Sequence, residues 1–338
     1  MRMTTEKNRK NEELLTDSYG RYVTNVRIAL TNACNLRCMY CHHEGEEING
    51  CNTCGSQHQD MTKEEIAELL AVFAELGVTT IKLTGGEPTL RADILDIIRS
   101  IPPHLESSMT TNGTLLAKCT GLRTMAQDLK DAGLTRVNIS LDTLRRDRYQ
   151  HIAGKDLLPE VLAGIDAALA AGLVPVKLNM VLLKGINDDE LENFLAFVRE
   201  RKNLILQIIE LMDMNGWTDT IDPSVRSNTE LVGDLEKLIA SRSTEVITRR
   251  MHHRRKYCLD GAEVEVVRPM HNFEFCANCN RLRVTSDGKL KPCLLCSGNE
   301  VDIKGMHGDE LREAIREAIQ RRRPYFRDVP GAPGSPNI

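Results

Sequence analysis

Residues 31–41 read Thr31-Asn32-Ala33-Cys34-Asn35-Leu36-Arg37-Cys38-Met39-Tyr40-Cys41 and directly follow a strand-like stretch, Val26–Leu30. Three thiolates with spacings x3 and x2 on one loop can bind three irons of a four-iron cubane, which leaves the fourth iron open to a ligand. A zinc knuckle is the alternative, because His42 or His43 could complete a zinc shell, although this spacing is not the usual one for structural zinc. The segment therefore predicts an iron–sulfur cluster with an open coordination position.

Strand-like and helix-like segments alternate after this loop. Thr62 and Glu65 are an expected capping box, followed by apolar residues at helical spacing. Six β-then-α units predict an α/β fold with a parallel sheet, either a partial barrel or an open doubly wound sheet, whose chemistry lies in the loops after the strands. The expected strands are Val26–Leu30, Ile81–Leu83, Ser108–Thr110, Val137–Leu141, Val176–Leu182 and Leu204–Leu211. The expected helices include Leu90–Ile98, Met125–Ala132, Leu158–Ala171 and Glu190–Arg201.

The pattern changes after Met212, which predicts a smaller C-terminal α+β domain. We expect a barrel domain over residues 17–212, the second domain over 213–328, and a Pro/Gly-rich, disordered tail over 329–338. In the second domain a Ser286-Asp287-Gly288 turn is expected to join two strands, and a helix is expected over Glu310–Arg322. The other expected strands there are Glu245–Arg249, Val264–Val267, Arg281–Thr285 and Lys289–Cys293.

Composition restricts the class of protein. The 338 residues are 41% apolar and 27% charged, with a net charge of −4, which indicates a globular protein and predicts no nucleic-acid or membrane partner. The first residues lack the apolar core of a signal peptide, and no apolar run approaches the roughly 20 residues of a membrane span, so we expect a cytoplasmic location. Eleven cysteines in a reducing compartment indicate metal or redox chemistry rather than disulfides.

A second group of three cysteines lies near the C-terminus. Cys276, Cys279 and Cys293 have the spacing C-x2-C-x13-C, which again offers three thiolates for a cluster with an open iron. Arg281 and Arg283 alternate along a strand, so their side chains point to one face, where two guanidiniums can receive a phosphate or a carboxylate. A structural zinc site and a solvated strand face are the alternatives.

Two motifs together resemble the radical S-adenosylmethionine (SAM) superfamily. They are the C-x3-C-x2-C loop with Tyr40 and the sequence Gly85-Gly86-Glu87-Pro88 after the next strand. The resemblance implies that the open iron binds the methionine part of SAM, whose cleavage gives a 5′-deoxyadenosyl radical. The glycines allow close backbone approach to the ligand, and Glu87 offers oxygens to its ammonium group.

Over about residues 17–325 the sequence resembles one family within it more closely, the GTP 3′,8-cyclases. The resemblance rests on both cysteine groups, Arg27, Lys177 and the sequences Thr110–Gly113, Asn138–Asp142, Lys184–Asp188 and Glu210–Asp213. It implies an incomplete (βα)6 radical-SAM barrel, closed at its open side by the C-terminal domain. Tyr40, Gly86, Ser140 and Met212 would surround SAM at the cluster of Cys34, Cys38 and Cys41. Arg27, Lys82, Thr110, Lys177, Arg281 and Arg283 would hold the ribose and triphosphate of GTP, and the cluster of Cys276, Cys279 and Cys293 would bind its guanine.

The implied reaction is the first step of molybdopterin cofactor biosynthesis. A radical removes hydrogen from C3′ of GTP, and C3′ then bonds to C8, giving (8S)-3′,8-cyclo-7,8-dihydroguanosine 5′-triphosphate. The implied cofactors are two [4Fe-4S] clusters and SAM. Implied partners are GTP, an electron donor and, downstream, a cyclic pyranopterin monophosphate synthase; homodimer formation is left open.

Some features depart from this family. Gln207 replaces an arginine that many relatives use for substrate phosphate, Thr80 replaces a basic residue, and the chain ends without the Gly-Gly pair of many members. The basic run Arg249–Lys256 could compensate for the lost charge, but a solvated loop is favoured. Cys51 and Cys54 are expected in a surface insertion, with a third metal site as the alternative. Cys296 could cap the second cluster as a fourth ligand.

Two other functions stay open from the residues. One is a radical SAM maturase that modifies peptides or proteins and carries auxiliary clusters. The other is a non-catalytic iron–sulfur or zinc-binding regulator, which would have no use for the Gly85–Pro88 motif.

Overall fold

The computed structural model describes residues 15–45, 59–212, 228–249, 251–270, 272–296 and 298–324. Cys51, Cys54 and the tail over residues 329–338 lie outside the described residues, and so does the segment that follows the expected domain boundary at Met212. Within the described part of the chain, no helix combines the length and the apolar character that crossing a membrane would require.

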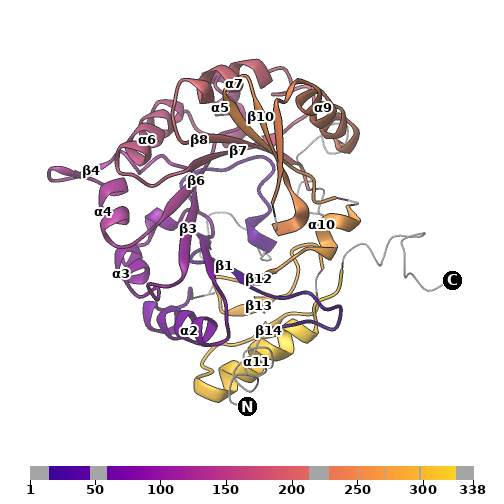
Figure 1. The fold of residues 1–338 in the computed structure, drawn as a ribbon. Helices are drawn as coiled ribbons and strands as arrows, with labels where there is room; N and C mark the ends of the chain where they lie inside the picture. The colour runs from indigo at the N-terminus through magenta and orange to yellow at the C-terminus, as the bar shows by residue number, and fades with distance from the viewer. Residues whose placement is uncertain are drawn as a thin grey trace, which may run out of the picture.

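Six parallel strands form the centre of one curved sheet, with helices around its outside (Figure 1). The strands are adjacent in chain order, which is the arrangement of a partial barrel and not of a doubly wound sheet. They are β1 (Asn25–Ala29), β2 (Thr80–Thr84), β3 (Glu106–Thr111), β6 (Arg136–Ser140), β7 (Val176–Leu182) and β8 (Leu204–Glu210). The outer helices are α2 (Lys63–Glu75), α3 (Ile94–Arg99), α4 (Met125–Asp131), α6 (Leu158–Ala170) and α7 (Leu191–Arg199).

The C-terminal residues extend this same sheet at both edges, so that it has 12 strands in the described part of the chain. At one edge β11 (Ala262–Val267) pairs in parallel with β8, followed by antiparallel β10 (Arg255–Leu259) and β9 (Glu245–Thr248). At the other edge β12 (Arg281–Val284) pairs in parallel with β1, followed by antiparallel β13 (Lys289–Lys291) and β14 (Val301–Asp302). The second cysteine group is therefore carried next to the first strand.

Short elements and further helices fill the connections. The helices are α5 (Arg146–Ala153), α9 (Thr229–Arg242), α10 (Phe273–Ala277) and α11 (Gly308–Gln320), and a small hairpin is formed by β4 (Cys119–Thr120) and β5 (Arg123–Thr124). Single 3-10 turns are η1 (His43–Gly45), η2 (Pro88–Leu90) and η3 (Met251–His253).

The expected helix over Leu90–Ile98 is divided at Arg91. Its backbone is extended between η2 and α3. The Arg91 guanidinium donates to the carbonyls of Leu30 at 2.7 Å and Met61 at 2.9 Å, and it pairs with Asp93. Arg91 thus links the end of β1 to the start of α2, a contact that a continuous helix would not allow. The expected capping box of α2 is confirmed.

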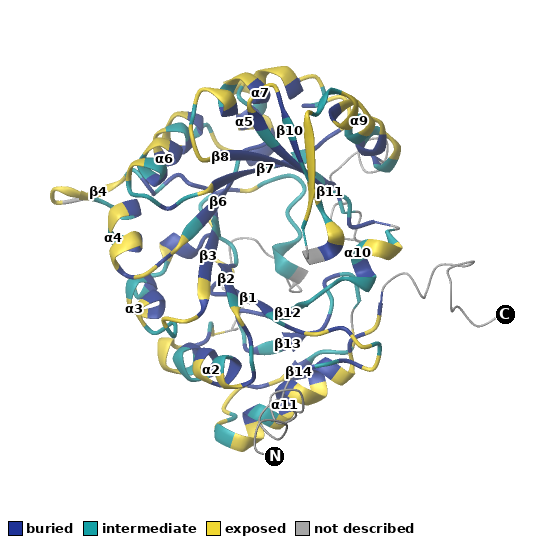
Figure 2. Cartoon of the chain, in the orientation of Figure 1, coloured by how far each residue is buried: buried dark blue, intermediate teal, exposed yellow. Residues whose placement is uncertain are grey.

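The apolar core lies between the sheet and the outer helices. Ile66, Leu70 and Phe73 on α2 are fully buried, as are the outward-facing Val26 and Ile28 of β1. Figure 2 shows the same division, with buried strands and helices that expose only their outer surfaces. The inner face of the sheet does not join this core, and polar side chains occupy it.

Gly86 brings the β2–η2 loop against the first cysteine loop. Its N–H donates to the carbonyl of Thr31 at 2.7 Å, and the N–H of Glu87 donates to the carbonyl of Ala33 at 2.8 Å. A Cβ on Gly86 would lie 2.7 Å from the carbonyl oxygen of Asn32 and closer still to that of Ala33. Glycine is therefore required here for the approach of two backbones.

We expect Gly86→Ala to lower the free energy of unfolding by more than about 2 kcal/mol, because neither backbone can move away freely. Urea unfolding measures the change. Gly233→Ala, in α9, is the control, because its Cβ would first meet the end of the Arg268 side chain at 3.4 Å. Equal stability of Gly86→Ala and wild type would show that this backbone approach does not require glycine.

Candidate active site

A cavity of about 400 Å³ lies on the inner face of the curved sheet. Its walls come from the six central strands, from β12 and from both cysteine loops. The sixteen site residues expected from the sequence all line it: Arg27, Cys34, Cys38, Tyr40, Cys41, Lys82, Gly86, Thr110, Ser140, Lys177, Met212, Cys276, Cys279, Arg281, Arg283 and Cys293. Cys34 and Cys276, which are 242 positions apart in the sequence, thus face the same cavity.

Strand register explains why the cations gather there. Arg27 of β1 lies opposite Lys82 on one side and opposite Arg283 on the other, so three cations form a row across adjacent strands. The row continues through Ser108 to Arg136. Because side chains alternate between the two faces of a strand, all of these residues point inward.

Placing these cations close together in a buried site shifts their pKa values. Burial and the neighbouring cations, Arg27 first, lower the pKa of Lys82 well below its usual value, and they lower the pKa of Arg283 to about 10. The buried hydroxyl of Thr110 has no hydrogen-bond partner among the described residues. Excess positive charge and an unsatisfied hydroxyl are what a cavity built for a polyanion would show.

Glu44, which the sequence did not single out, lies between two of these cations. Its carboxylate pairs with Arg27 at 3.2 Å and Arg283 at 2.7 Å, and it accepts the Thr84 hydroxyl at 2.7 Å. Although burial raises it, the two guanidiniums hold the pKa of Glu44 far below its usual value, so this carboxylate is ionised. No sequence pattern marks Glu44, because only the register of β1 and β12 places the two arginines beside it.

The first cysteine loop presents Cys34, Cys38 and Cys41 to the cavity. Burial raises the pKa of each of these thiols, that of Cys41 to about 11, so the protein alone favours the neutral form. Within the described ranges no three histidine, cysteine or carboxylate side chains are close enough to hold one metal ion. A four-iron cluster does not need such a single-ion site, because each thiolate binds a different iron. Three sulfur donors on one wall fit such a cluster.

Two buried arginines, which also line the cavity, hold the backbone of the second cysteine loop. Arg21 donates to the carbonyl of Cys276 at 3.1 Å, and Arg322 donates to that of Cys279 at 2.7 Å. Asp17 binds both guanidiniums, at 2.7 Å and 2.9 Å, and its side chain is fully buried. Segments from both ends of the described chain therefore fix this loop.

Cys296 lies beside the cavity without contributing to its described lining. A hydrogen bond between its side chain and Cys293 is the largest effect that lowers the pKa of Cys293, to about 6. This contact keeps open the sequence-based alternative in which Cys296 is a further ligand.

Tyr40 is fixed by a network behind the first cysteine loop. Its hydroxyl donates to Asp142 at 2.5 Å, and the other oxygen of Asp142 accepts the N–H of Val181 at 2.8 Å. The amide of Asn187 donates to the carbonyls of Asp142 and Val181 at 2.8 Å and 2.9 Å. The loops after β6 and β7 are thereby joined.

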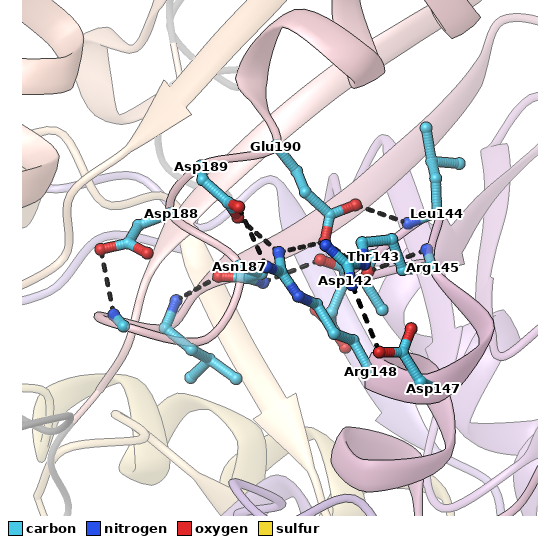
Figure 3. Close-up of polar contacts among 12 residues, drawn as sticks. Asp142, Thr143, Leu144, Arg145, Asp147, Arg148, Asn187, Asp188, Asp189 and Glu190 are labelled. Carbon is cyan, nitrogen blue, oxygen red and sulfur yellow. Dashed lines mark hydrogen bonds and ion pairs between the residues drawn. The ribbon is translucent and has the colours of Figure 1, made fainter.

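Glu190 strengthens the same junction, as Figure 3 shows. Its buried carboxylate accepts the hydroxyl of Thr143 and the N–H of Leu144 at 2.9 Å, and it pairs with Arg148 at 2.9 Å. The Lys184–Asp188 sequence therefore has a structural role. Its Asn187 positions Asp142, and none of its side chains belongs to the described lining of the cavity.

Glu87 does not have the role expected for it. Its side chain is fully buried, and its two oxygens accept hydrogen bonds from Thr89, from the Thr111 hydroxyl at 2.7 Å and from the N–H of Asn112 at 2.6 Å. The carboxylate therefore fixes the loop after β3 and is not directed at a ligand's ammonium group.

The favoured interpretation of the basic run Arg249–Lys256 as a solvated loop fits His253 and Arg255, which are exposed, but not His252 and Arg254. His252 is buried and stacks on the ring of Phe275 at 3.8 Å between centroids. Arg254 is only 15% exposed, and both residues line the cavity together with Gln207. Thr80 is half-buried and does not belong to the described lining.

Comparison with known proteins assigns the family. The sequence matches "Radical SAM superfamily" over residues 28–198 and "Molybdenum Cofactor Synthesis C" over residues 204–327. It is 48% identical over 322 residues to the "Probable GTP 3′,8-cyclase" of Methanosarcina mazei, with 94% of this chain and 92% of that protein covered. The chain belongs to the GTP 3′,8-cyclase family. A relative of the same name from Archaeoglobus fulgidus is 44% identical and is covered completely, by 93% of this chain.

Solved structures support the radical-SAM fold. Streptococcus suis SuiB, bound to precursor peptide SuiA, superposes with a TM-score of 0.64 at 16% identity, covering 96% of this chain and 69% of that one. HydG, a maturase of the [FeFe]-hydrogenase, superposes with a TM-score of 0.53 at 15% identity, covering 85% and 62%. Membership of the GTP 3′,8-cyclase family makes this chain a radical SAM enzyme, with a [4Fe-4S] cluster and SAM as cofactors, and not a non-catalytic regulator.

The pairing of Asp17 with Arg21 and Arg322, which hold the second cysteine loop, gives a testable expectation. Asp17→Asn should lower the free energy of unfolding by about 3 kcal/mol, because two buried guanidiniums lose their shared counter-ion. Urea unfolding measures this loss. Asp234→Asn removes an exposed pair with Lys237 and should leave stability nearly unchanged. Similar effects of both substitutions on stability would contradict the role of Asp17 as the shared counter-ion of Arg21 and Arg322.

Proposed function

We propose that this enzyme converts GTP to (8S)-3′,8-cyclo-7,8-dihydroguanosine 5′-triphosphate, the first step of molybdopterin cofactor biosynthesis. One observation carries the proposal: two cysteine groups and a row of cations, far apart in sequence, line one cavity. Relatives with 42–48% identity over most of the chain are named for this activity.

Each part of the cavity has a proposed occupant. Cys34, Cys38 and Cys41 would hold the first cluster, with Tyr40, Gly86, Ser140 and Met212 around SAM. Cys276, Cys279 and Cys293 would hold a second [4Fe-4S] cluster, whose open iron would bind guanine. Arg27, Lys82, Thr110, Lys177, Arg281 and Arg283 would hold the ribose and triphosphate. An external electron donor and a downstream cyclic pyranopterin monophosphate synthase complete the proposal.

The first cluster, held by Cys34, Cys38 and Cys41, and SAM would supply the radical chemistry that removes the C3′ hydrogen of GTP. Formation of the C3′–C8 bond would then need one electron, from the external donor, and one proton to complete the product. The chain's own residues bind and orient. Cations in the row around Arg27 neutralise the triphosphate, which carries about four negative charges. The cavity walls would hold C3′ near C8 in the bound nucleotide.

The decisive experiment is anaerobic reconstitution followed by iron counting and turnover. We expect about eight irons per chain, and 5′-deoxyadenosine formation that depends on GTP and is accompanied by the cyclised nucleotide. Cleavage of SAM that ignores GTP would contradict the proposal. Cys276→Ser should lose about half of the iron, whereas Cys296→Ser should keep it together with turnover; loss of turnover in Cys296→Ser would show that Cys296 is a ligand.

Binding of GTP should also take up protons near pH 8. Burial lowers the pKa of Lys177 to about 8 in the free protein, and a nearby polyanion favours the charged form and raises that pKa. At a pH between the pKa of Lys177 in the free protein and its pKa in the complex, the complex holds more protons than the free protein. The affinity for GTP therefore falls as pH rises through this range. Calorimetry in two buffers of different ionisation enthalpy measures the uptake. Lys177→Met should reduce it, and an unchanged uptake would exclude Lys177 as its source.

A further inference from the structure

Glu44 places an anionic side chain within the row of cations that lines the cavity. Its side chain is 12% exposed, as is that of Arg283. Both residues line the cavity together with Arg27 and Thr84. Glu44 is the third residue after Cys41, so it belongs to the loop that carries the first cysteine group. The loop that supplies three thiols therefore also brings a carboxylate to the cations expected to bind substrate.

Both oxygens of this carboxylate accept hydrogen bonds. Oε1 accepts from the Thr84 hydroxyl at 2.7 Å and from Nη1 of Arg27 at 3.2 Å. Oε2 accepts from Nη1 of Arg283 at 2.7 Å. Two guanidiniums and one hydroxyl that converge on one point suit phosphate oxygens as well as they suit a carboxylate. In this structure Glu44 thus occupies a place that has the donors of a phosphate subsite.

The backbone that carries Glu44 has an uncommon conformation. His43 has a φ of 45° and Glu44 a φ of 54°, so two successive residues other than glycine lie in the left-handed region. Such a conformation costs free energy, and it persists where surrounding contacts compensate for it. The pairing of the Glu44 carboxylate with the two guanidiniums provides this compensation. The segment is therefore held by the same cations that a polyanion would use.

A phosphate group is the stronger anion at this place. It carries about two negative charges and presents three acceptor oxygens, whereas a carboxylate has one charge and two oxygens. At equal distance the attraction to a guanidinium grows with the charge. The Glu44 side chain has three rotatable bonds, so its carboxylate can turn away while the backbone stays. Such an exchange replaces one anion by another, and the buried guanidiniums keep a counter-ion throughout.

We propose that Glu44 is an internal competitor of the substrate, whose triphosphate displaces the Glu44 carboxylate. The place that the carboxylate leaves is a phosphate subsite of Arg27, Arg283 and Thr84. The inference rests on the proposed function, which puts the triphosphate in this row of cations, and it adds Glu44 as a residue that determines affinity. An internal competitor lowers the apparent affinity in proportion to the fraction of molecules in which the subsite is free.

The test measures binding of inorganic tripolyphosphate and of GTP to the reconstituted enzyme by calorimetry. Glu44→Gln removes the charge and keeps the shape. It should bind both ligands about tenfold more tightly than wild type, the gain expected if Glu44 fills the subsite for about nine-tenths of the time. Glu44→Asp keeps the charge but is one methylene too short to maintain both arginine pairs, so it should also bind more tightly than wild type.

Glu263→Gln is the control, because it removes an equal charge from a pair with Lys256 that does not belong to the described lining of the cavity. It should bind both ligands as wild type does. A gain in Glu44→Gln that Glu263→Gln shares, or that Glu44→Asp lacks, would reduce the effect to long-range charge and overturn the inference. Unchanged or weaker binding in Glu44→Gln would overturn it too. Thermal unfolding checks the fold, and Glu44→Asp carries the test if Glu44→Gln does not fold.

Guanosine and product analysis separate this inference from the proposed function. Guanosine has no phosphate, so wild type and Glu44→Gln should bind it equally, and a gain for guanosine would contradict competition at a phosphate subsite. Tighter binding of tripolyphosphate to Glu44→Gln, with no GTP-dependent product from the wild type, would keep Glu44 as a competitor and reject the proposed reaction. GTP-dependent product with the same tripolyphosphate affinity in both proteins would do the reverse.

Discussion

Positive charge concentrated on the inner face of the curved sheet is the constraint on which the rest of the structure depends. Arg27, Lys82 and Arg283 lie side by side across three strands, and burial together with repulsion between neighbouring cations lowers the pKa of Lys82 and of Arg283. Such a row is stable when carboxylates oppose it and when the remaining fold is strong. Glu44 pairs with Arg27 and Arg283 of this row, and Glu265 pairs with Lys177 in the same cavity wall. The apolar layer between sheet and helices stabilises the rest of the fold.

Both edges of the six-stranded partial barrel contribute to the cavity, because C-terminal strands pair there with β1 and with β8. At β12–β1 the C-terminal residues bring the second cysteine loop and two arginines beside the first strand. At β8–β11 they bring Glu265 and the loop that carries Arg254. The C-terminal residues are therefore part of the wall of the site, and the partial barrel alone would lack one cysteine group and several of its cations.

Much of the site follows from sequence because short-range spacing carries its chemistry. The cysteine spacings, the Gly85-Gly86 pair and the alternation of Arg281 with Arg283 are local patterns, and each led to residues that line the cavity. Glu44 has no such pattern, because its partner Arg283 is distant in sequence and lies beside it only in the folded chain. Arg254 belongs to the basic run Arg249–Lys256, but the run alone does not show that this side chain lines the cavity. Glu87 is a motif residue for which the sequence suggested contact with a ligand. Its carboxylate instead accepts hydrogen bonds from the Thr111 hydroxyl and the Asn112 N–H of the next loop.

By itself the sequence determined the alternation of strands and helices, the two groups of thiols and the family to which the chain belongs. Hydrophobic periodicity and ligand spacing are properties of neighbouring residues, so they can be read without coordinates. Only the tertiary structure decided which charges face one another. Electrostatic energy depends on distance and burial, and the pairing of β12 with β1 and of β11 with β8 sets both for residues far apart in the chain.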